Sequence, residues 1–288
     1  MNTITLNNGV QMPQLGFGVY QIPLAETAEA VYQAIKAGYR LIDTAAIYGN
    51  EKETGEGIDR AIKEGLVTRE ELFVTSKLFI LQTPEETAAE TIVHSLSVMN
   101  LAYLDLYLIH QPYGEVYGAW RALAAAQKAG KVRAIGISNF KSAKMIEFVG
   151  LTDVKPQINQ IEVNPWYQRE EDQIWHEKYD VQVEAWAPFA EGRHDLFQNP
   201  ELAAIGQQYG KTVGQVVLRW LMQRGIVALA KSVRPERMAE NIDIFDFSLT
   251  EADMKRIAAL DKQESAFFDH DAPQQVEWFM NRMLDTEK

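Results

Sequence analysis

The sequence of 288 residues contains no cysteine. This absence excludes disulfide bonds, thiolate zinc sites and cysteine nucleophiles, and it fits a reducing compartment. Histidine is also scarce, and no two histidines form an HxH or HExxH pair with the spacing of metal ligands. We therefore expect no metal and disfavour a metal-dependent barrel hydrolase or isomerase. The five histidines are His94, His110, His176, His194 and His270.

Positive charge is in deficit, because 40 acidic residues outnumber 28 lysines and arginines and leave a formal net charge of −12. Such a chain is poorly suited to non-specific binding of nucleic acid or of an anionic membrane surface. No apolar run approaches the length of a membrane span, and the first residues, MNTITLNNGVQMP, lack the basic and apolar regions of a secretory signal. We expect a cytoplasmic protein with neither nucleic acid nor membrane as a partner.

The chain does contain a regular alternation of short β-rich runs and longer amphipathic stretches. Helical patterns cover residues 25–37, 83–99 and 116–129. Glycines follow several helical runs, where a left-handed residue would end the helix: Gly38, Gly65, Gly130 and Gly150. The predicted strands lie at residues 14–18, 40–43, 72–77, 104–110, 132–138, 157–162, 182–187 and 226–230.

This alternation predicts parallel strands in one continuous sheet, and eight units fit a (β/α)8 TIM barrel better than an open sheet. An open dinucleotide-binding sheet would carry the pattern GxGxxG after its first strand. Gly16 and Gly18 occupy the first two glycine positions, but Gln21 occupies the third, so we interpret these glycines as close-packing residues of the first strand. We predict one α/β domain over residues 1–288, with an N-terminal hairpin at 1–12 and a C-terminal extension at about 263–288. Residues 188–224 form a longer segment than one connection between strands needs, so they should hold an extra loop or helix.

Polar side chains stand where three successive predicted strands end. Asp43, Lys77 and His110 occupy these positions, and Tyr48 lies in the loop after Asp43. Each has an ordinary structural explanation alone, but strand ends of a barrel converge on one mouth. Glu51 is interpreted only as the acidic start of a helix.

Together these residues predict a proton-donor assembly. A tyrosine hydroxyl has an ordinary pKa near 10, which is too high for efficient proton donation at neutral pH. A lysine ammonium nearby would lower that pKa by stabilising tyrosinate, and an aspartate would hold the lysine charged. A histidine could hydrogen-bond a carbonyl oxygen, so the assembly would act on a developing alkoxide.

Three ordered segments resemble the signatures of the aldo-keto reductase family. GYRLIDTAAIYGNEKETG (38–55) matches the first, except that Thr54 stands where an aliphatic residue is usual; VRAIGISNF (132–140) and LAKSVRPERMAENIDI (229–244) match the second and third. The resemblance covers nearly the whole chain and implies a monomeric NADP-dependent oxidoreductase that reduces aldehydes or ketones to alcohols by hydride transfer. The tail SAFFDHDAP (265–273) is similar to bacterial members, including 2,5-diketo-D-gluconate reductases and broad-specificity aldehyde reductases, so the implied substrates are small dicarbonyls, keto-sugars or aromatic aldehydes.

The resemblance also implies roles for individual residues. Tyr48 would be the general acid, supported by Lys77 and Asp43, and His110 would orient the substrate carbonyl. The substrate would contact Tyr20, Tyr48, Phe79 and His110. The nicotinamide carboxamide would bind Ser138, Asn139 and Gln160, and the nicotinamide ring would stack on Trp186.

A basic cluster of Lys231, Arg234 and Arg237 follows the last predicted strand, where a phosphate site at a helix start is favoured. By the resemblance, Lys231, Ser232 and Arg237 hold the 2′-phosphate, which predicts NADP(H) over NAD(H). The full set of implied cofactor contacts is Gly18, Val19, Tyr20, Asp43, Ser138, Asn139, Gln160, Trp186, Ala187, Pro188, Phe189, Lys231, Ser232, Val233, Arg237, Glu240 and Asn241.

Departures from the family pattern concern the substrate side. Phe79 and Gln111 stand where many relatives carry tryptophan, and the loop QPYGEVYGAW is short, which suggests an open pocket with broad tolerance. The alternative function is a non-catalytic barrel that binds NADP(H) as a sensor or regulatory subunit. The intact set of four site residues disfavours this alternative, because a pure binder needs no acid assembly.

Overall fold

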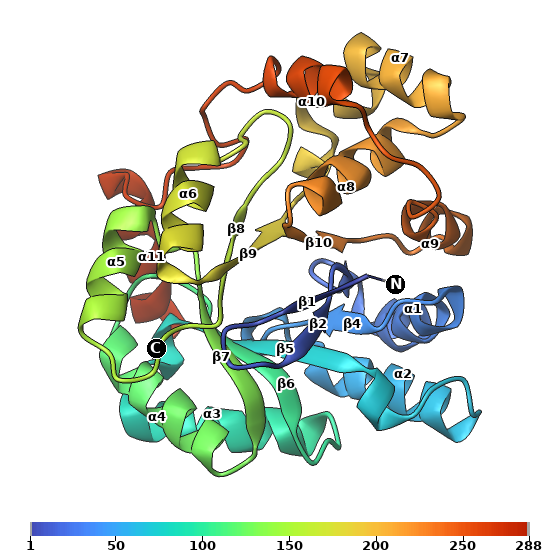
Figure 1. The fold of residues 1–288 in the computed structure, drawn as a ribbon. Helices are drawn as coiled ribbons and strands as arrows, with labels where there is room; N and C mark the ends of the chain where they lie inside the picture. Colours follow the sequence, from blue (N-terminus) through green and yellow to red (C-terminus); the bar gives the residue numbers. More distant parts are fainter. Residues whose placement is uncertain (1, 287–288) are drawn as a thin grey trace.

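Eight parallel strands close into a barrel in the computed structural model, which describes residues 2–286 (Figure 1). Each strand pairs with its neighbours in the chain, and the last strand pairs with the first. The predicted TIM barrel is therefore confirmed, and every strand boundary agrees with the predicted one to within one residue. The strands are β3 (Leu15–Gly18), β4 (Leu41–Asp43), β5 (Phe73–Leu78), β6 (Leu104–Ile109), β7 (Val132–Ser138), β8 (Ile158–Glu162), β9 (Gln182–Trp186) and β10 (Val227–Ala230).

Helices surround the sheet in Figure 1, and the three predicted helical patterns are α1, α3 and α4. The connection at 188–224 holds η4, α7 and α8, as its length predicted. The α-helices are α1 (Leu24–Ala37), α2 (Glu51–Lys63), α3 (Glu85–Val98), α4 (Val116–Lys128), α5 (Ser142–Gly150), α6 (Glu170–Tyr179), α7 (Pro200–Tyr209), α8 (Val213–Gln223), α9 (Pro235–Ile242), α10 (Glu251–Ala258) and α11 (Pro273–Thr286). The 3-10 helices are η1 (Ala46–Tyr48), η2 (Arg69–Glu71), η3 (Ile80–Gln82) and η4 (Ala190–Gln198).

Three of the four glycines expected to end helices do so with a left-handed backbone. Gly38, Gly65 and Gly130 have φ angles of 111°, 72° and 74°. The expectation for Gly150 is wrong, because this residue is the last of α5 and its φ is not positive. The capping residue is Leu151, whose amide donates back to the carbonyls of Glu147 and Phe148 in the last turn.

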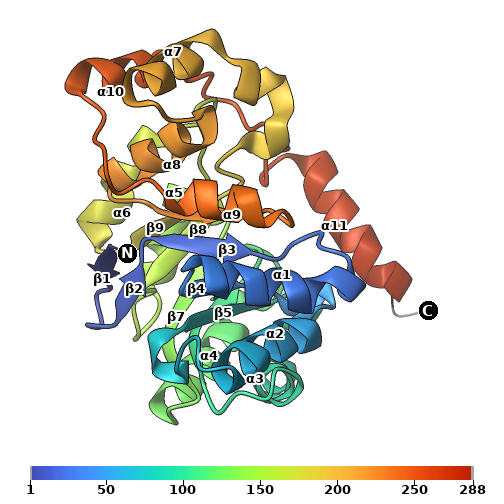
Figure 2. The ribbon, with the colours of Figure 1, turned by 90° about the vertical axis from the view of Figure 1, so that its right-hand side faces the viewer.

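The N-terminal hairpin closes one end of the barrel. Its strands β1 (Thr3–Thr5) and β2 (Gln11–Pro13) pair antiparallel, and Leu6 and Met12 pack on the apolar residues inside the barrel. Figure 2 shows the hairpin and α11 on opposite sides of the molecule. Met1 and residues 287–288, which belong to the predicted hairpin and extension, lie outside the described residues.

The barrel interior changes from apolar to polar along the strands. Leu41 and Ile158 belong to the apolar layer near the hairpin, and Asp43 and Gln160 follow on the same faces two residues later. At the first strand, a Cβ on Gly16 would lie 2.6 Å from the Leu41 side chain, which confirms close packing there, whereas a Cβ on Gly18 would lie 4.0 Å from Leu229, so the expectation does not hold at Gly18. Between residues 2 and 286, no helix has both the length and the apolar character needed to cross a membrane.

Candidate active site

The four residues predicted at the strand ends meet at the mouth opposite the hairpin. Asp43 ends β4, Lys77 is near the end of β5, His110 directly follows β6 and Tyr48 ends η1. The Lys77 Nζ atom lies 2.5 Å from Asp43 Oδ1 and 3.5 Å from the Tyr48 hydroxyl, and it donates to the Thr44 carbonyl at 2.9 Å. A buried ammonium is thus held by two acceptors beside the phenol.

The proton of Tyr48 is held more tightly than the sequence argument expected. Burial raises the pKa of Tyr48 to about 12, and the Lys77 charge opposes this rise without overcoming it. Burial by itself lowers the pKa of Lys77, but the charge of Asp43, the hydrogen bond to it and the nearby Tyr48 together outweigh burial and leave that pKa raised. At neutral pH, Tyr48 is therefore a phenol beside an ammonium, which is the protonation state of a general acid.

His110 is neutral in this site. Its burial and the charge of Lys77 hold its pKa well below the ordinary value of 6.5. Its ring centroid lies 5.6 Å from that of Tyr48 and 5.8 Å from that of Phe79. Its Nδ1 atom is buried and has no hydrogen-bond partner within residues 2–286. A neutral imidazole carries one N–H donor, so it can hydrogen-bond an oxygen without adding charge.

Further aromatic rings lie beside Tyr48 and His110. Tyr20, which is 52% exposed, lies 4.8 Å from Tyr48 between ring centroids. Phe79 and Tyr113 lie 6.4 Å and 5.3 Å from Phe279 of α11. Helix α11 therefore packs against the loop after β6 and against the residue that follows β5. Sequence reasoning missed Tyr113 and Phe279, because Tyr113 lies in the loop beyond His110, Phe279 lies in a helix near the C-terminus, and neither belongs to a recognised motif.

The residues predicted to bind the carboxamide lie together and are bonded to one another. Asn139 Oδ1 accepts from Trp186 Nε1 at 2.8 Å, and Asn139 Nδ2 donates to the His110 carbonyl at 3.0 Å. Ser138 Oγ donates to the Gln160 carbonyl at 2.8 Å. The Asn139 amide thus connects the ends of β6, β7 and β9, and its oxygen keeps a second lone pair for a ligand.

A buried carboxyl that the sequence analysis did not identify lies beside this group. The Gln160 Nε2 atom donates to Asp43 Oδ2 at 3.0 Å and to Glu184 Oε2 at 2.9 Å. Glu184 is fully buried on β9, two residues before Trp186. Burial, together with the charge of Asp43, raises the pKa of Glu184 to about 8. The period-two alternation from Trp186 was the one signal that could have placed Glu184 in the interior.

The basic cluster is exposed after β10, at the start of α9. Lys231 Nζ donates to Gln21 Oε1 at 3.1 Å, and Arg237 donates to both carboxylate oxygens of Glu240 at 2.7 Å and 2.9 Å. Ser232 and Val233 lie between β10 and α9, and Asn241 is buried in α9. The remaining predicted cofactor contacts lie at the ends of β3 and β9 or directly after them: Gly18, Val19, Tyr20, Ala187, Pro188 and Phe189.

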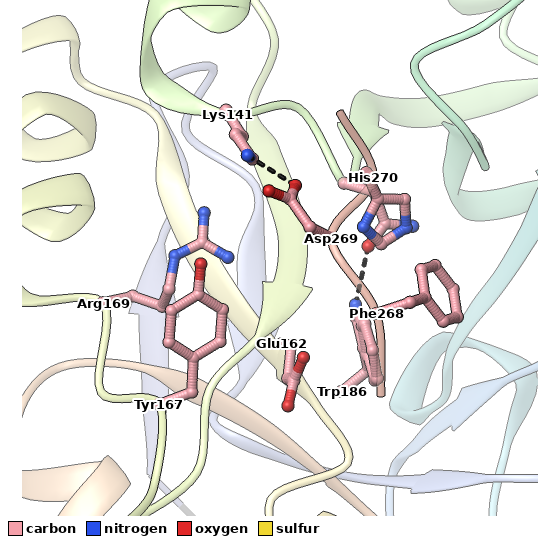
Figure 3. Close-up of a pocket in the computed structure, with 9 residues that line it drawn as sticks. Lys141, Glu162, Tyr167, Arg169, Trp186, Phe268, Asp269 and His270 are labelled. Carbon is pink, nitrogen blue, oxygen red and sulfur yellow. Dashed lines mark hydrogen bonds and ion pairs between the residues drawn. The ribbon is translucent and has the colours of Figure 1, made fainter. Parts of the chain in front are cut away.

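The C-terminal extension crosses the mouth as a tail strap, which we define as residues 264–272. Ser265 Oγ and the Ala266 amide donate to the Glu162 carboxylate at 2.5 Å and 3.0 Å. Lys141 reaches Asp269 across the pocket shown in Figure 3, and the Phe267 ring lies 5.2 Å from that of Trp186. The cavity beneath the tail strap measures about 20 Å³, close to the space that one water molecule needs.

Comparisons with known proteins agree with this geometry. Residues 14–262 match the model of the Aldo/keto reductase family. The glyoxal reductase of Bacillus subtilis (strain 168) is 44% identical over 265 residues, which cover 91% of this chain and 94% of that protein. The methylglyoxal reductase DkgA of Escherichia coli (strain K12) is 39% identical over 262 residues, which cover 90% of this chain and 93% of that protein.

A solved structure is similar over the same extent. The crystal structure of a Bombyx mori aldo-keto reductase in complex with NADP has a TM-score of 0.90 and 35% identity, and the match covers 95% of this chain and 98% of that one. The family match, the relatives and the barrel lead to one conclusion. This chain belongs to the aldo/keto reductase family and is an oxidoreductase of that family.

Proposed function

We propose that this protein reduces small aldehydes and ketones to alcohols with NADPH, on a single barrel domain spanning residues 1–288. The observation that carries the proposal is the buried row of Asp43, Lys77 and Tyr48, in which an ammonium lies within 3.5 Å of a protonated phenol. A non-catalytic NADP(H) sensor or regulatory subunit would have no need for such a row.

The chain's own part in the reaction is to bind the carbonyl and deliver a proton. Tyr48 donates its hydroxyl proton to the substrate oxygen as that oxygen becomes negative, and Lys77 stabilises the tyrosinate that remains. Asp43 keeps Lys77 charged and in place. His110, being neutral, donates one hydrogen bond that holds the carbonyl beside Tyr48. When bound, NADPH supplies the hydride that adds to the carbonyl carbon, so the product is an alcohol.

The residues at the mouth fit a nicotinamide nucleotide. Trp186 offers a half-buried aromatic ring at the end of β9, its indole N–H donates to the Asn139 amide, and Gln160 lies on the neighbouring strand β8. Lys231 and Arg237 are exposed cations in a molecule of net charge −12, and arginine can bind a phosphate with two hydrogen bonds. These features support NADP(H) as the cofactor, with the 2′-phosphate on the basic cluster.

The substrate class that we favour is the small dicarbonyls. The relatives named glyoxal reductase and methylglyoxal reductase support this choice. The ring of Phe279 against Phe79 and Tyr113 also supports it, because α11 narrows the apolar side of the site. Keto-sugars and aromatic aldehydes are the other classes to test in a substrate panel.

The experiment follows the loss of NADPH absorbance with methylglyoxal and with a nitrobenzaldehyde. We expect turnover by the wild-type protein, near-complete loss of turnover in Tyr48→Phe, and NADPH binding by that variant close to wild type. Retained turnover in Tyr48→Phe would remove Tyr48 from the acid role. Tight NADPH binding by the wild-type protein without turnover of any carbonyl in the panel would favour the sensor.

A further inference from the structure

The side-chain amide of Gln160 lies between two buried carboxyl groups. One N–H of its Nε2 atom points to Asp43 Oδ2 and the other to Glu184 Oε2, at 3.0 Å and 2.9 Å. An amide nitrogen has two hydrogens, so this nitrogen is fully used. The amide oxygen accepts no hydrogen bond within residues 2–286, and it is not among the atoms sealed from solvent.

The two carboxyls decide which way the amide of Gln160 faces. A flipped amide would direct its oxygen at Asp43 Oδ2, and two acceptors at 3.0 Å repel each other. Asp43 alone would fix one N–H and let the second move, and its other oxygen is already taken by Lys77. Glu184 supplies the second point of attachment, so the amide oxygen of Gln160 is left available at the open end of the barrel.

We propose that Glu184 is a positioning residue: by holding the second N–H of Gln160, it presents the amide oxygen of Gln160 as the acceptor for the carboxamide N–H of the nicotinamide. The inference rests on the proposed function, because it requires NADP(H) at this mouth. It also assigns a use to a fully buried carboxyl of β9 that touches none of the reacting atoms.

The surroundings of Glu184 favour its neutral form. The charged groups nearest to it come from β4 and β5, namely the Asp43 carboxylate and the Lys77 ammonium, which already balance each other. Glu184 Oε1 is buried and without a partner among the described residues, and an ionised oxygen in that position would be costly. A neutral acid still accepts the Gln160 N–H through its carbonyl oxygen, so Glu184→Gln preserves this function and Glu184→Leu removes it.

The test compares two cofactors that differ in one donor. The 3-acetylpyridine analogue of NADP⁺ carries a methyl ketone in place of the carboxamide, so it cannot donate to Gln160. Dissociation constants for NADP⁺ and the analogue would be measured by quenching of tryptophan fluorescence. We expect the wild-type protein and Glu184→Gln to prefer NADP⁺ by about tenfold, the effect of one buried hydrogen bond. In Glu184→Leu this preference should fall below about threefold.

Glu51→Leu is the matched control, because Glu51 is also buried and accepts from Ser76 Oγ at 2.6 Å, but on the outer side of β5 with α2. It should lower thermal stability and keep the tenfold preference. If Glu184→Leu does not fold, Glu184→Thr serves, since its hydroxyl is too short to reach Gln160. An unchanged preference in Glu184→Leu, or in Glu184→Thr where that variant is used, would overturn the inference, and so would an equal loss in Glu51→Leu. A wild-type protein that does not bind NADP⁺ would instead overturn the proposed function.

Discussion

The Tyr48 hydroxyl combines a close ammonium with a pKa of about 12, and this combination has opposite consequences for the two directions of reaction. Carbonyl reduction needs the phenol, which persists to well above neutral pH. Alcohol oxidation needs tyrosinate as the base, whose fraction rises tenfold per pH unit below the pKa. We predict that kcat/KM for oxidation with NADP⁺ rises steadily from about pH 6 to about pH 9. Over the same range, proton donation by Tyr48 should not change kcat/KM for reduction, because the phenol stays protonated.

The measurement is a pair of pH profiles on the same protein, with Glu184→Gln as a companion variant that removes the other group titrating near pH 8. An oxidation profile that levels off near pH 7 in both proteins would mean that Tyr48 titrates far lower than burial dictates. Reduction that declines from about pH 7 in both proteins would mean the same.

Residue by residue, sequence reasoning located those members of the site that end strands or belong to signatures. Asp43, Lys77 and His110 follow β-rich runs, so alternation placed them at one mouth. The same reasoning correctly predicted that Lys77 lowers the pKa of Tyr48. It missed the larger effect of burial, which raises this pKa and depends on atoms from other strands. Glu184 was missed for a related reason, since a glutamate inside a strand is predicted to face solvent unless its partner is known.

The tail strap is held by two kinds of contact of unequal strength. Lys141 pairs with Asp269 and Asp271, but these side chains are 36%, 55% and 64% exposed, so each pair contributes little. Ser265 donates instead to Glu162, whose carboxylate is buried. We predict that Ser265→Ala loosens the strap more than the double substitution Asp269→Asn and Asp271→Asn does.

Urea unfolding and limited proteolysis of the tail would check this order. We expect Ser265→Ala to cost about 1–3 kcal/mol of unfolding free energy and to speed cleavage near the strap, whereas the double substitution should cost less than about 1 kcal/mol. Raised salt should weaken the Lys141 pairs alone. Faster cleavage in the double variant than in Ser265→Ala would show that the exposed ion pairs of Lys141, and not the hydrogen bond from Ser265 to Glu162, hold the strap in place.

At the level of elements, the strands were predictable and the irregular segments were not. Short apolar runs bounded by turn signals fixed β3 to β10 within one residue, because each run must bury both faces. The η4 segment contains left-handed residues such as Glu191, His194 and Asp195, which no local preference demands. The strap likewise takes its path from Glu162 and Trp186, which lie far before it in the chain, on β8 and β9.

The whole molecule carries a net charge of −12, so an anionic cofactor meets overall repulsion and depends on the local cations after β10. Arg237 can bind a phosphate with two hydrogen bonds, and in this structure its guanidinium donates to Glu240. We predict that Arg237→Met weakens binding of NADPH by about tenfold to a hundredfold, the effect of losing a hydrogen bond to a charged group. It should leave NADH binding nearly unchanged, because NADH lacks the 2′-phosphate.

Thermal unfolding measures this difference in NADPH affinity as a difference in the stability of the folded protein, because a ligand that binds only the native state stabilises it by RT ln(1 + [L]/Kd). At a concentration of about 100 Kd, NADPH should add about 2.7 kcal/mol to the wild-type protein. The same concentration should add about 0.4–1.4 kcal/mol to Arg237→Met, since its Kd is tenfold to a hundredfold higher. Arg69→Met is the control, because Arg69 pairs with the buried Asp105 near the start of β6, at the end of the strands opposite the cluster; it should lower the melting temperature of the free protein and keep the full NADPH gain. Equal gains from NADPH and NADH in the wild-type protein would contradict the assignment of the basic cluster to the 2′-phosphate.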